Sequence, residues 1–217
     1  MSSVFFTADT HFGHANIIRF CKRPWYNPKT DVERVKLERT VDGVGVVEEI
    51  ERWVSPEIAE KRKREMDAAL IYNWNAVVKP GDIVWHLGDY CMGYNEADFM
   101  SYFRQLNGSV ILIKGNHDRL AWKFRDMFYG HYNSYVETKI NERAFTLCHY
   151  ALRVWNKSHH GAWHLYGHSH GSLPDNPNSY SLDVGVDCHN YAPISFERVA
   201  ALMAGNTFKP IDHHGQL

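Results

Sequence analysis

The sequence predicts an α/β domain of packed sheets flanked by helices. Short apolar runs alternate with helical patterns in the first half of the chain, and the second half carries mostly strand patterns. This order is typical of domains in which helices cover sheets. The chain has 217 residues, of which 44% are hydrophobic and 23% charged. That length and balance suit one core, so we expect a single domain over residues 1–217.

Five apolar runs predict the strands. They occupy residues 4–8, 83–87, 110–113, 145–148 and 163–166. Each run is short and contains aromatic or β-branched residues, which favours buried strands. Every run stops at a polar residue or at a glycine followed by one. We therefore expect chemically active side chains at the ends of these strands.

Two helices are predicted between the first three runs, over residues 57–78 and 96–106. Ser55 is a good N-cap for the first helix, and Pro56 suits its first position because that position needs no backbone donor. Alternation of strand and helix therefore holds up to residue 113.

Residues 30–54 are the least regular part of the sequence. Apolar residues recur there at helical spacing, at Val44, Val47 and Ile50. Two nearby glycines, Gly43 and Gly45, weaken a helix. Charged side chains would solvate one side of the segment, namely Glu33, Arg34, Lys36, Glu38 and Arg39. We expect a cap or flap insertion at about residues 30–54 rather than a part of the core.

Composition limits the classes of partner. Lys plus Arg (24) nearly equals Asp plus Glu (25), so charge indicates no dedicated nucleic-acid surface. The N-terminus lacks the pattern of a signal peptide, and no apolar run is long enough for a membrane span. Four scattered cysteines without a CxxC pair predict reduced thiols and a cytoplasmic location.

Polar residues that follow the strands form a candidate metal site. Asp9 and His11 are two residues apart, so strand alternation would point both side chains the same way. Asp89 follows Gly88, and a carboxylate has two oxygens with which it can bridge two ions. The run Gly115-Asn116-His117-Asp118 supplies an amide oxygen and a histidine free to face a substrate. The alternative for this run is a Gly-Asn turn with a surface histidine.

His149 and the run Gly167-His168-Ser169-His170 complete the set. The alternative for His149 alone is a hydrogen-bonded core histidine. Together the candidate ligands are two carboxylates, one amide and four imidazoles: Asp9, His11, Asp89, Asn116, His149, His168 and His170. Oxygen and nitrogen ligands without thiolate suit manganese, with iron, zinc, nickel or cobalt as alternatives. Seven ligands are too many for one tetrahedral ion, so the sequence predicts two divalent ions sharing a bridging carboxylate.

In order, the motifs DTH, GD, GNHD, H and GHSH resemble those of the calcineurin-like metallophosphoesterase superfamily, over residues 9–170. Longer phrases are similar to a small bacterial and phage phosphoesterase group within it, namely ADTHFGHANIIRFC, LIYNWNAVV, HLGDY, YGHSH and LDVGVD. The resemblance implies a four-layer fold, a central β-sandwich of two mixed sheets flanked by helices. The segment over residues 30–67 is longer than the resemblance leads us to expect for that group. This affects the expected shape of the substrate entrance.

The resemblance also implies a role for each motif residue. It places Asp9, His11 and His170 on a first metal, and Asn116, His149 and His168 on a second. Asp89 would bridge the metals, and His117 would be the catalytic histidine over the substrate.

The expected reaction is hydrolysis of a phosphate ester, preferably a diester, by attack of a metal-bridging hydroxide. Asp89 would position the hydroxide, and His117 would protonate the leaving alkoxide. The substrate would be small, nucleotides included. Two alternatives remain open: a phosphomonoesterase or nucleotidase with the same site, and a non-catalytic metal-bearing scaffold protein.

Four further residues are candidates for binding the substrate: His14, Arg19, Arg23 and Asn190. The first three closely follow the first motif, and an arginine suits a phosphate. The alternative is a helix that exposes ordinary polar side chains.

Overall fold

The structure is a computed structural model and describes residues 2–93, 95–174 and 176–212. The chain divides into two compact units, which we describe separately. The smaller unit is His14–Ala68, and the larger unit holds the rest of the described chain. Helix α2 (Pro56–Val77) contributes residues to both.

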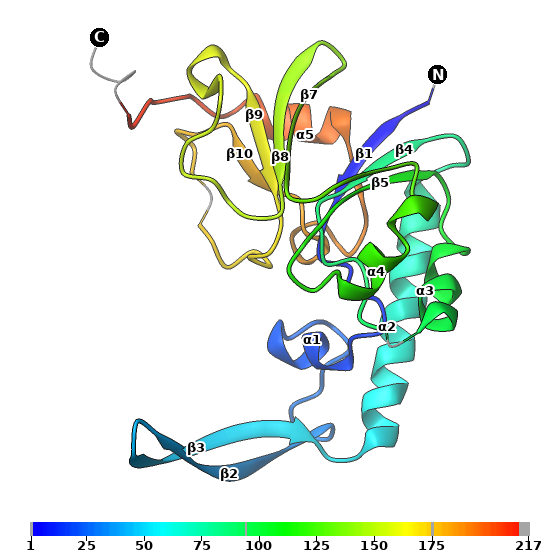
Figure 1. Ribbon diagram of the computed structural model, residues 1–217, viewed down its shortest axis with the longest axis vertical. Coiled ribbons are helices and arrows are strands. Elements are labelled where there is room, and N and C mark those ends of the chain that lie inside the picture. Colours follow the sequence, from blue (N-terminus) through cyan, green and yellow to red (C-terminus); the bar gives the residue numbers. More distant parts are fainter. Residues whose placement is uncertain (1, 94, 175, 213–217) are drawn as a thin grey trace. The chain divides into compact units, whose positions relative to one another are not determined.

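Two mixed sheets form the larger unit (Figure 1). The first is, in spatial order, β11 (Ile194–Ser195), β1 (Val4–Thr7), β4 (Ile83–His86), β5 (Ser109–Ile113) and β6 (Gly130–Tyr132). The second is β10 (Ser181–Asp183), β9 (Trp163–Tyr166), β8 (Arg143–Cys148) and β7 (Tyr135–Ile140). All neighbours are parallel except β11 beside β1 and β7 beside β8, which are antiparallel. The five predicted strands are therefore present.

The two sheets pack face to face around one apolar core. Phe6 and Leu87 from the first sheet and the loop after it join Phe145 and Leu165 from the second sheet in a single buried cluster. The rings of Phe6 and Phe145 stack with centroids 5.4 Å apart. Burial of this kind contributes roughly 1.5–3 kcal/mol for each large apolar side chain. It fixes the strand ends that carry the candidate ligands.

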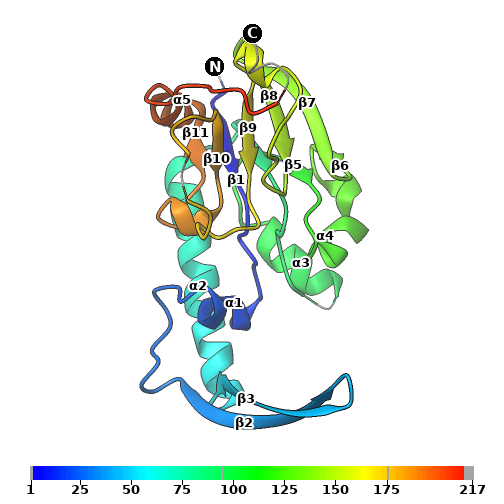
Figure 2. The same ribbon diagram turned by 90° about the vertical axis from the view of Figure 1, so that its left-hand side faces the viewer.

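Helices cover the opposite face of the five-stranded sheet (Figures 1 and 2). Trp74 of α2 stacks on His86 of β4, with ring centroids 6.4 Å apart. Phe99 of α3 (Glu96–Phe103) packs 5.1 Å from Phe124, which follows α4 (Arg119–Lys123). The predicted capping is also present, since the Ile58 N–H donates to Ser55 Oγ at 3.3 Å. The predicted class, two mixed sheets flanked by helices, is confirmed.

The remaining elements are short. Helix α5 (Phe196–Met203) follows β11, and its Val199 and Met203 reach the core between the sheets. Three 3₁₀ turns connect other elements: η1 (Arg125–Met127), η2 (Ser158–His160) and η3 (Val186–Cys188).

The smaller unit contains α1 (Ala15–Phe20) and a long hairpin of β2 (Val32–Val41) and β3 (Val44–Trp53). The helical spacing of apolar residues near Val44 was therefore misleading. Asp42 and Gly43 form the turn with φ of 50° and 80°, which matches the Asp-Gly turns that suit two-residue hairpins. That dipeptide, together with β-branched residues on both sides, was the better signal.

Candidate metal centre

The first candidate ligands lie on two loops that run side by side beyond β1 and β4. The Asp9 N–H donates to Gly88 O at 2.9 Å, and the His11 N–H donates to Asp89 O at 3.0 Å. Thr10 points the other way, and its hydroxyl donates to Tyr90 O at 2.7 Å. Asp9 and His11 therefore share a direction, as predicted, but the predicted reason was wrong. Both residues lie beyond the end of β1, and their backbone is left-handed rather than extended.

Left-handed backbone is concentrated at the candidate ligands. Five of the seven have positive φ, at 57° for Asp9, 50° for His11, 57° for Asp89, 68° for His168 and 47° for His170. Residues with side chains rarely adopt this conformation, which costs on the order of 1–3 kcal/mol each and clusters at functional sites. The surrounding fold therefore holds these side chains in directions that a relaxed chain would not choose.

A first donor group consists of Asp9, His11 and His170. One ligand atom from each lies within 4.8 Å of the others. The rings of His11 and His170 stack with centroids 5.3 Å apart. Nδ1 of His170 lies 2.7 Å from Asp187 Oδ2, and a proton on Nδ1 would make Nε2 the nitrogen that can bind an ion. A carboxylate behind a metal-binding histidine commonly fixes the tautomer in this way.

A second donor group consists of Asp89, His149 and His168, again with ligand atoms within 4.8 Å. Asn116 joins it, since its Oδ1 lies 2.9 Å from His149 Nε2 and 3.1 Å from His168 Nδ1. Nδ1 of His149 must carry a proton, because its partner at 2.7 Å is the carbonyl oxygen of Leu87. Nε2 of His149 is therefore the ligand atom.

Asp89 connects the two groups. Its Oδ2 lies 3.5 Å from His11 Nε2 and 3.4 Å from His149 Nε2. Its Oδ1 accepts the backbone N–H of His117 at 2.8 Å. One oxygen is thus held by the backbone, and the other faces histidines of both groups.

Two glycines allow other backbone segments to approach the carboxylates. A Cβ on Gly115 would lie 2.3 Å from Asp89 Oδ1, and a Cβ on Gly167 would lie 2.5 Å from Asp9 Oδ2. Both distances are far below van der Waals contact. The glycines in GNHD and GHSH are therefore needed because no side chain fits beside Asp89 and Asp9.

Asp118 stabilises the loops rather than serving as a ligand. It is fully buried and accepts three backbone N–H groups: those of Asp89 at 2.8 Å, Tyr90 at 2.7 Å and Gly115 at 2.7 Å. Buried polar groups in such a position cost about 1–3 kcal/mol each when they lose a partner. Asp118 therefore joins the GD and GNHD loops, while Asp89 contacts His117 through the backbone.

Burial controls the charge of the site. It raises the pKa of Asp9 to about 7, although the nearby His170 and His149 partly offset this. Burial also acts to raise the pKa of Asp89, but the hydrogen bond and charge of His149 outweigh it and leave that pKa below its usual value. For His149, burial lowers the pKa, and Asp89 more than compensates, so the pKa is raised. Two buried carboxylates this close favour cations beside them.

The donor set fits metal ions. Both groups offer carboxylate oxygen and imidazole nitrogen, the second adds an amide oxygen, and neither contains a thiolate among the residues described above. Such donors suit divalent transition metals. The structure brings together all seven candidate ligands, with His117 beside them at a ring distance of 5.6 Å from His11.

The four candidate substrate residues are divided between the two units. Asn190 is an exposed residue of the larger unit, and its carbonyl accepts from Asn73 Nδ2 at 3.4 Å. His14, Arg19 and Arg23 belong to the smaller unit. Arg19 Nη2 lies 3.3 Å from Asn16 Oδ1. Arg23 is fully buried, with Nη1 3.3 Å from Met66 Sδ, and burial argues against the expected contact with substrate.

Sequence reasoning missed two residues of the site. One is Asp187, whose signal was its place four residues after Asp183 in the phrase LDVGVD. The other is Tyr150, which follows His149 directly. Its hydroxyl donates to Asn116 Oδ1 at 3.3 Å, and its ring lies 4.6 Å from that of His168.

We expect Asp187→Asn to weaken metal affinity about 10–100-fold, the usual effect of losing a carboxylate behind a metal-binding histidine. The reason is the 2.7 Å contact with His170 Nδ1, which an amide would leave weaker and free to turn. Titration of the purified variant with Mn²⁺, followed by calorimetry, would measure the change. Asp212→Asn removes a carboxylate elsewhere in the larger unit and is the matched control. Unchanged affinity in Asp187→Asn would show that Asp187 does not position His170.

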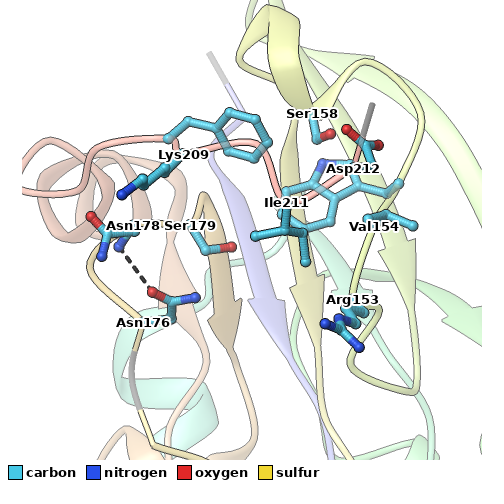
Figure 3. Close-up of a pocket in the computed structure, with 11 residues that line it drawn as sticks. Arg153, Val154, Ser158, Asn176, Asn178, Ser179, Lys209, Ile211 and Asp212 are labelled. Carbon is cyan, nitrogen blue, oxygen red and sulfur yellow. Dashed lines mark hydrogen bonds between the residues drawn. The ribbon is translucent and has the colours of Figure 1, made fainter. Parts of the chain in front are cut away.

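A separate hollow lies near the end of the described chain (Figure 3). Its volume is about 40 Å³, and Arg153, Ser158, Asn176 and Lys209 are among its lining residues. The Asn178 N–H donates to Asn176 Oδ1 at 3.0 Å across its edge. Space of that size holds roughly one or two waters. It is too small for a phosphate ester.

The chain is similar to known proteins in sequence and in fold. The chain is 30% identical to an uncharacterised protein of Methanocaldococcus jannaschii, over 94% of this chain and 92% of that protein. It is 24% identical to the gene 66 protein of Mycobacterium phage D29, over 89% and 93%. The crystal structure of a protein of unknown function from Aquifex aeolicus shares the fold, with a TM-score of 0.60 and 18% identity over 93% of this chain and 100% of that one.

A family model described as the calcineurin-like phosphoesterase superfamily domain matches residues 66–181. That span contains Asp89, Asn116, His117, His149 and the GHSH run. The family match and the archaeal relative together show that the chain belongs to the calcineurin-like phosphoesterase superfamily.

Proposed function

We propose that this phosphoesterase binds two divalent ions in one site and hydrolyses phosphodiesters. The observation that carries the proposal is the position of Asp89 Oδ2, at 3.5 Å from His11 Nε2 and 3.4 Å from His149 Nε2. These histidines belong to different donor groups, so one carboxylate oxygen lies within reach of both. Paired ions in hydrolases of this kind are typically about 3.5–4 Å apart and share such a ligand.

Two divalent ions, when bound, would supply Lewis-acid charge and lower the pKa of a water molecule between them. Asp9, His11 and His170 would hold one ion, and Asn116, His149 and His168 the other, with Asp89 shared. The donor set supports manganese, with iron, zinc, nickel and cobalt as alternatives. The two carboxylates offset only part of the ionic charge, so the site stays positive and attracts an anionic ester.

His117 would act on the leaving group. Its backbone is fixed by the bond to Asp89 Oδ1, and its side chain is exposed. A proton on a ring nitrogen of His117 could therefore reach the departing alkoxide, which is the role of a general acid.

A diester is favoured over a monoester for a reason of charge. None of the motifs DTH, GD, GNHD and GHSH contains a lysine or arginine, the residues that usually bind the second charge of a phosphate group. A diester carries only one negative charge. Small esters, nucleotide derivatives included, are the proposed substrates.

The experiment is to load the purified protein with Mn²⁺, count the ions by elemental analysis, and compare turnover of bis(nitrophenyl) phosphate with that of nitrophenyl phosphate. We expect two ions per chain and faster hydrolysis of the diester. A maximum of one ion with full activity would contradict the paired site. Faster hydrolysis of the monoester would favour the phosphatase alternative, and no hydrolysis of either would favour the scaffold.

We also propose that residues 30–54 are a cap or flap insertion outside the core. This is supported by the exposure of most of the hairpin and by its place in a separate compact unit. Val32 pairs with Trp53 at its base, so a short glycine linker between residues 31 and 54 could replace it. The shortened protein should keep its metal content and change its preference among esters. Failure to fold would show that the segment belongs to the core.

We propose a cytoplasmic location because the cysteines form no disulfide bonds. All four are free thiols, as is usual where the compartment is reducing. None of the helices in the described ranges combines the length and apolar character that a membrane span requires. Protease protection and fractionation of the producing cells would test the location, and recovery outside the cytoplasm would contradict it.

A further inference from the structure

The outer edge of β2 is open. Within residues 2–93, 95–174 and 176–212, the hairpin sheet has two strands, β2 and β3, which pair only with each other (Figure 2). Each strand is ten residues long. A long edge strand presents unused backbone N–H and C=O groups and can pair with another strand. Such an edge calls for a partner or for protection.

The turn determines which backbone groups point outward. Val41 and Val44 flank the two-residue turn, and in such a hairpin this first pair exchanges both of its hydrogen bonds. Pairs along the ladder then alternate. Residues 32, 34, 36, 38 and 40 of β2 therefore direct their N–H and C=O groups away from β3.

The sequence of β2 is complementary to itself around Lys36. Residues 33–39 read Glu-Arg-Val-Lys-Leu-Glu-Arg. Aligned antiparallel with a second copy about Lys36, Glu33 meets Arg39 and Arg34 meets Glu38, while Val35 meets Leu37. Each match occurs twice, because the pairing is symmetric. Shifting the second copy by two residues, the smallest step that keeps outward-facing residues opposite each other, either leaves Lys36 with Glu38 as the one kind of opposite-charge match or sets Arg34 against Lys36.

We propose that this chain forms a homodimer in which β2 of one copy pairs antiparallel with β2 of a second copy, centred on Lys36. The result is a continuous four-stranded sheet with a two-fold axis. Such a contact is closed, since the same edge is used by both copies, and it ends at two chains. This inference does not depend on the proposed diesterase activity.

Apolar side chains on one face of the hairpin support the dimer. Val35, Leu37 and Val41 of β2 and Val44, Val46 and Ile50 of β3 point to the same side, because directions alternate along each strand. The charged residues on this side are Glu33, Arg39, Glu48 and Arg52. Leu37 is 45% exposed and Val44 64% exposed. In the pairing about Lys36, this side of both hairpins lies on the same face of the four-stranded sheet. The apolar side chains of the two copies would therefore form one continuous surface.

The edge of β3 is a poorer candidate. It carries three glutamates and one arginine, and self-pairing about Ile50 would oppose Glu49 to Glu51. The β2 pairing has one unfavourable like-charge pair, Lys36 with Lys36 of the second copy. It has four favourable pairs of opposite charge. Like charges directly opposite each other are unfavourable, but lysine is long enough for both ammonium groups to point into water.

Cross-linking of the unmodified protein gives a direct test. A short amine-reactive cross-linker, followed by mass spectrometry, should yield a peptide pair in which Lys36 is linked to Lys36. A residue cannot be linked to itself within one chain, so this product forms only between two copies. Sedimentation of the same protein should show a monomer–dimer equilibrium.

Two charge reversals test the register. Glu38→Arg sets arginine against Arg34 of the second copy, and Arg34→Glu sets glutamate against Glu38. Each variant alone should dimerise at least about ten-fold more weakly, because two pairs change from opposite to like charge. An equal mixture of the two variants restores every opposite-charge pair and should form a heterodimer. Glu197→Arg makes the same change of charge as Glu38→Arg at an exposed position of α5 and should leave dimerisation unchanged.

The outcomes are decisive. A protein that stays monomeric at the highest concentrations accessible to sedimentation overturns the proposal. So does a dimer that neither reversal weakens, since it must use another surface. A dimer weakened by both reversals but not re-formed on mixing contradicts the register about Lys36. Circular dichroism of each variant, matching that of the unchanged protein, ensures that a lost dimer reflects lost pairing and not an unfolded hairpin.

Discussion

Asp89→Asn is expected to lower turnover by at least about 100-fold, because partners one step removed from a metal already cost 10–100-fold. Asparagine keeps an oxygen for the His117 N–H, so the loop can retain its backbone bond. It then replaces the charged oxygen between His11 and His149 by an uncharged NH2 group. The loss should exceed that of any single change at Asn116, His149 or His168, because Asp89 lies within reach of both donor groups.

Metal content and turnover should be measured together for this variant. We expect fewer ions per chain as well as slower hydrolysis. Asp126→Asn is the matched control, since the Asp126 side chain is 82% exposed and lies outside the site. Normal metal content with nearly normal turnover in Asp89→Asn would show that Asp89 does not bridge two ions.

His117→Ala is expected to slow hydrolysis of an alkyl phosphate ester by about 10²–10⁴-fold, the usual range for general acid–base catalysis. The fall on a nitrophenyl ester should be clearly smaller, because nitrophenolate departs without a proton. The protein should fold normally, since the side chain is exposed and the backbone N–H that bonds Asp89 is retained. Both ions should stay bound.

Turnover on the two esters separates the roles of His117. Equal losses would leave it as a charge that holds the phosphoryl oxygens, and no loss on either ester would favour the scaffold alternative. His160→Ala is a suitable control, because His160 is exposed and its ring packs on His159 at 4.1 Å. It removes an imidazole without touching the metal centre.

Much of the fold and the candidate site could be predicted because both depend on local signals. The runs at residues 4–8 and 83–87 became β1 and β4 to within a residue, since short apolar runs that end in polar residues have few alternatives to a buried strand. Strand ends on neighbouring parallel strands meet at one edge. The candidate ligands that follow these strands therefore lie close together at that edge. Their roles in binding metal stay predictions.

Other features depend on contacts far apart in the sequence. The contact between Asp187 and His170 spans a loop and depends on how two turns pack, which no spacing rule contains. The left-handed backbone at Asp9 and His11 occurs where both residues bond to the neighbouring loop, a contact between distant parts of the sequence. In the hairpin, a helical spacing of apolar residues (Val44, Val47 and Ile50) competed with a turn signal, and the strands follow the turn. The single domain over residues 1–217 stays a prediction.

The glycines beside the carboxylates bear on how this site can diverge. Exchanging one ligand for another alters a single donor atom, and the backbone around it can stay in place. Adding even a methyl group at Gly115 or Gly167 would push against Asp89 or Asp9 at 2.3 and 2.5 Å, and so would move a carboxylate and everything it holds. Metal preference is therefore easier to change in evolution than the positions of the two carboxylates. Descendants of this chain with new ion preferences should differ in donor residues and keep these two positions without side chains.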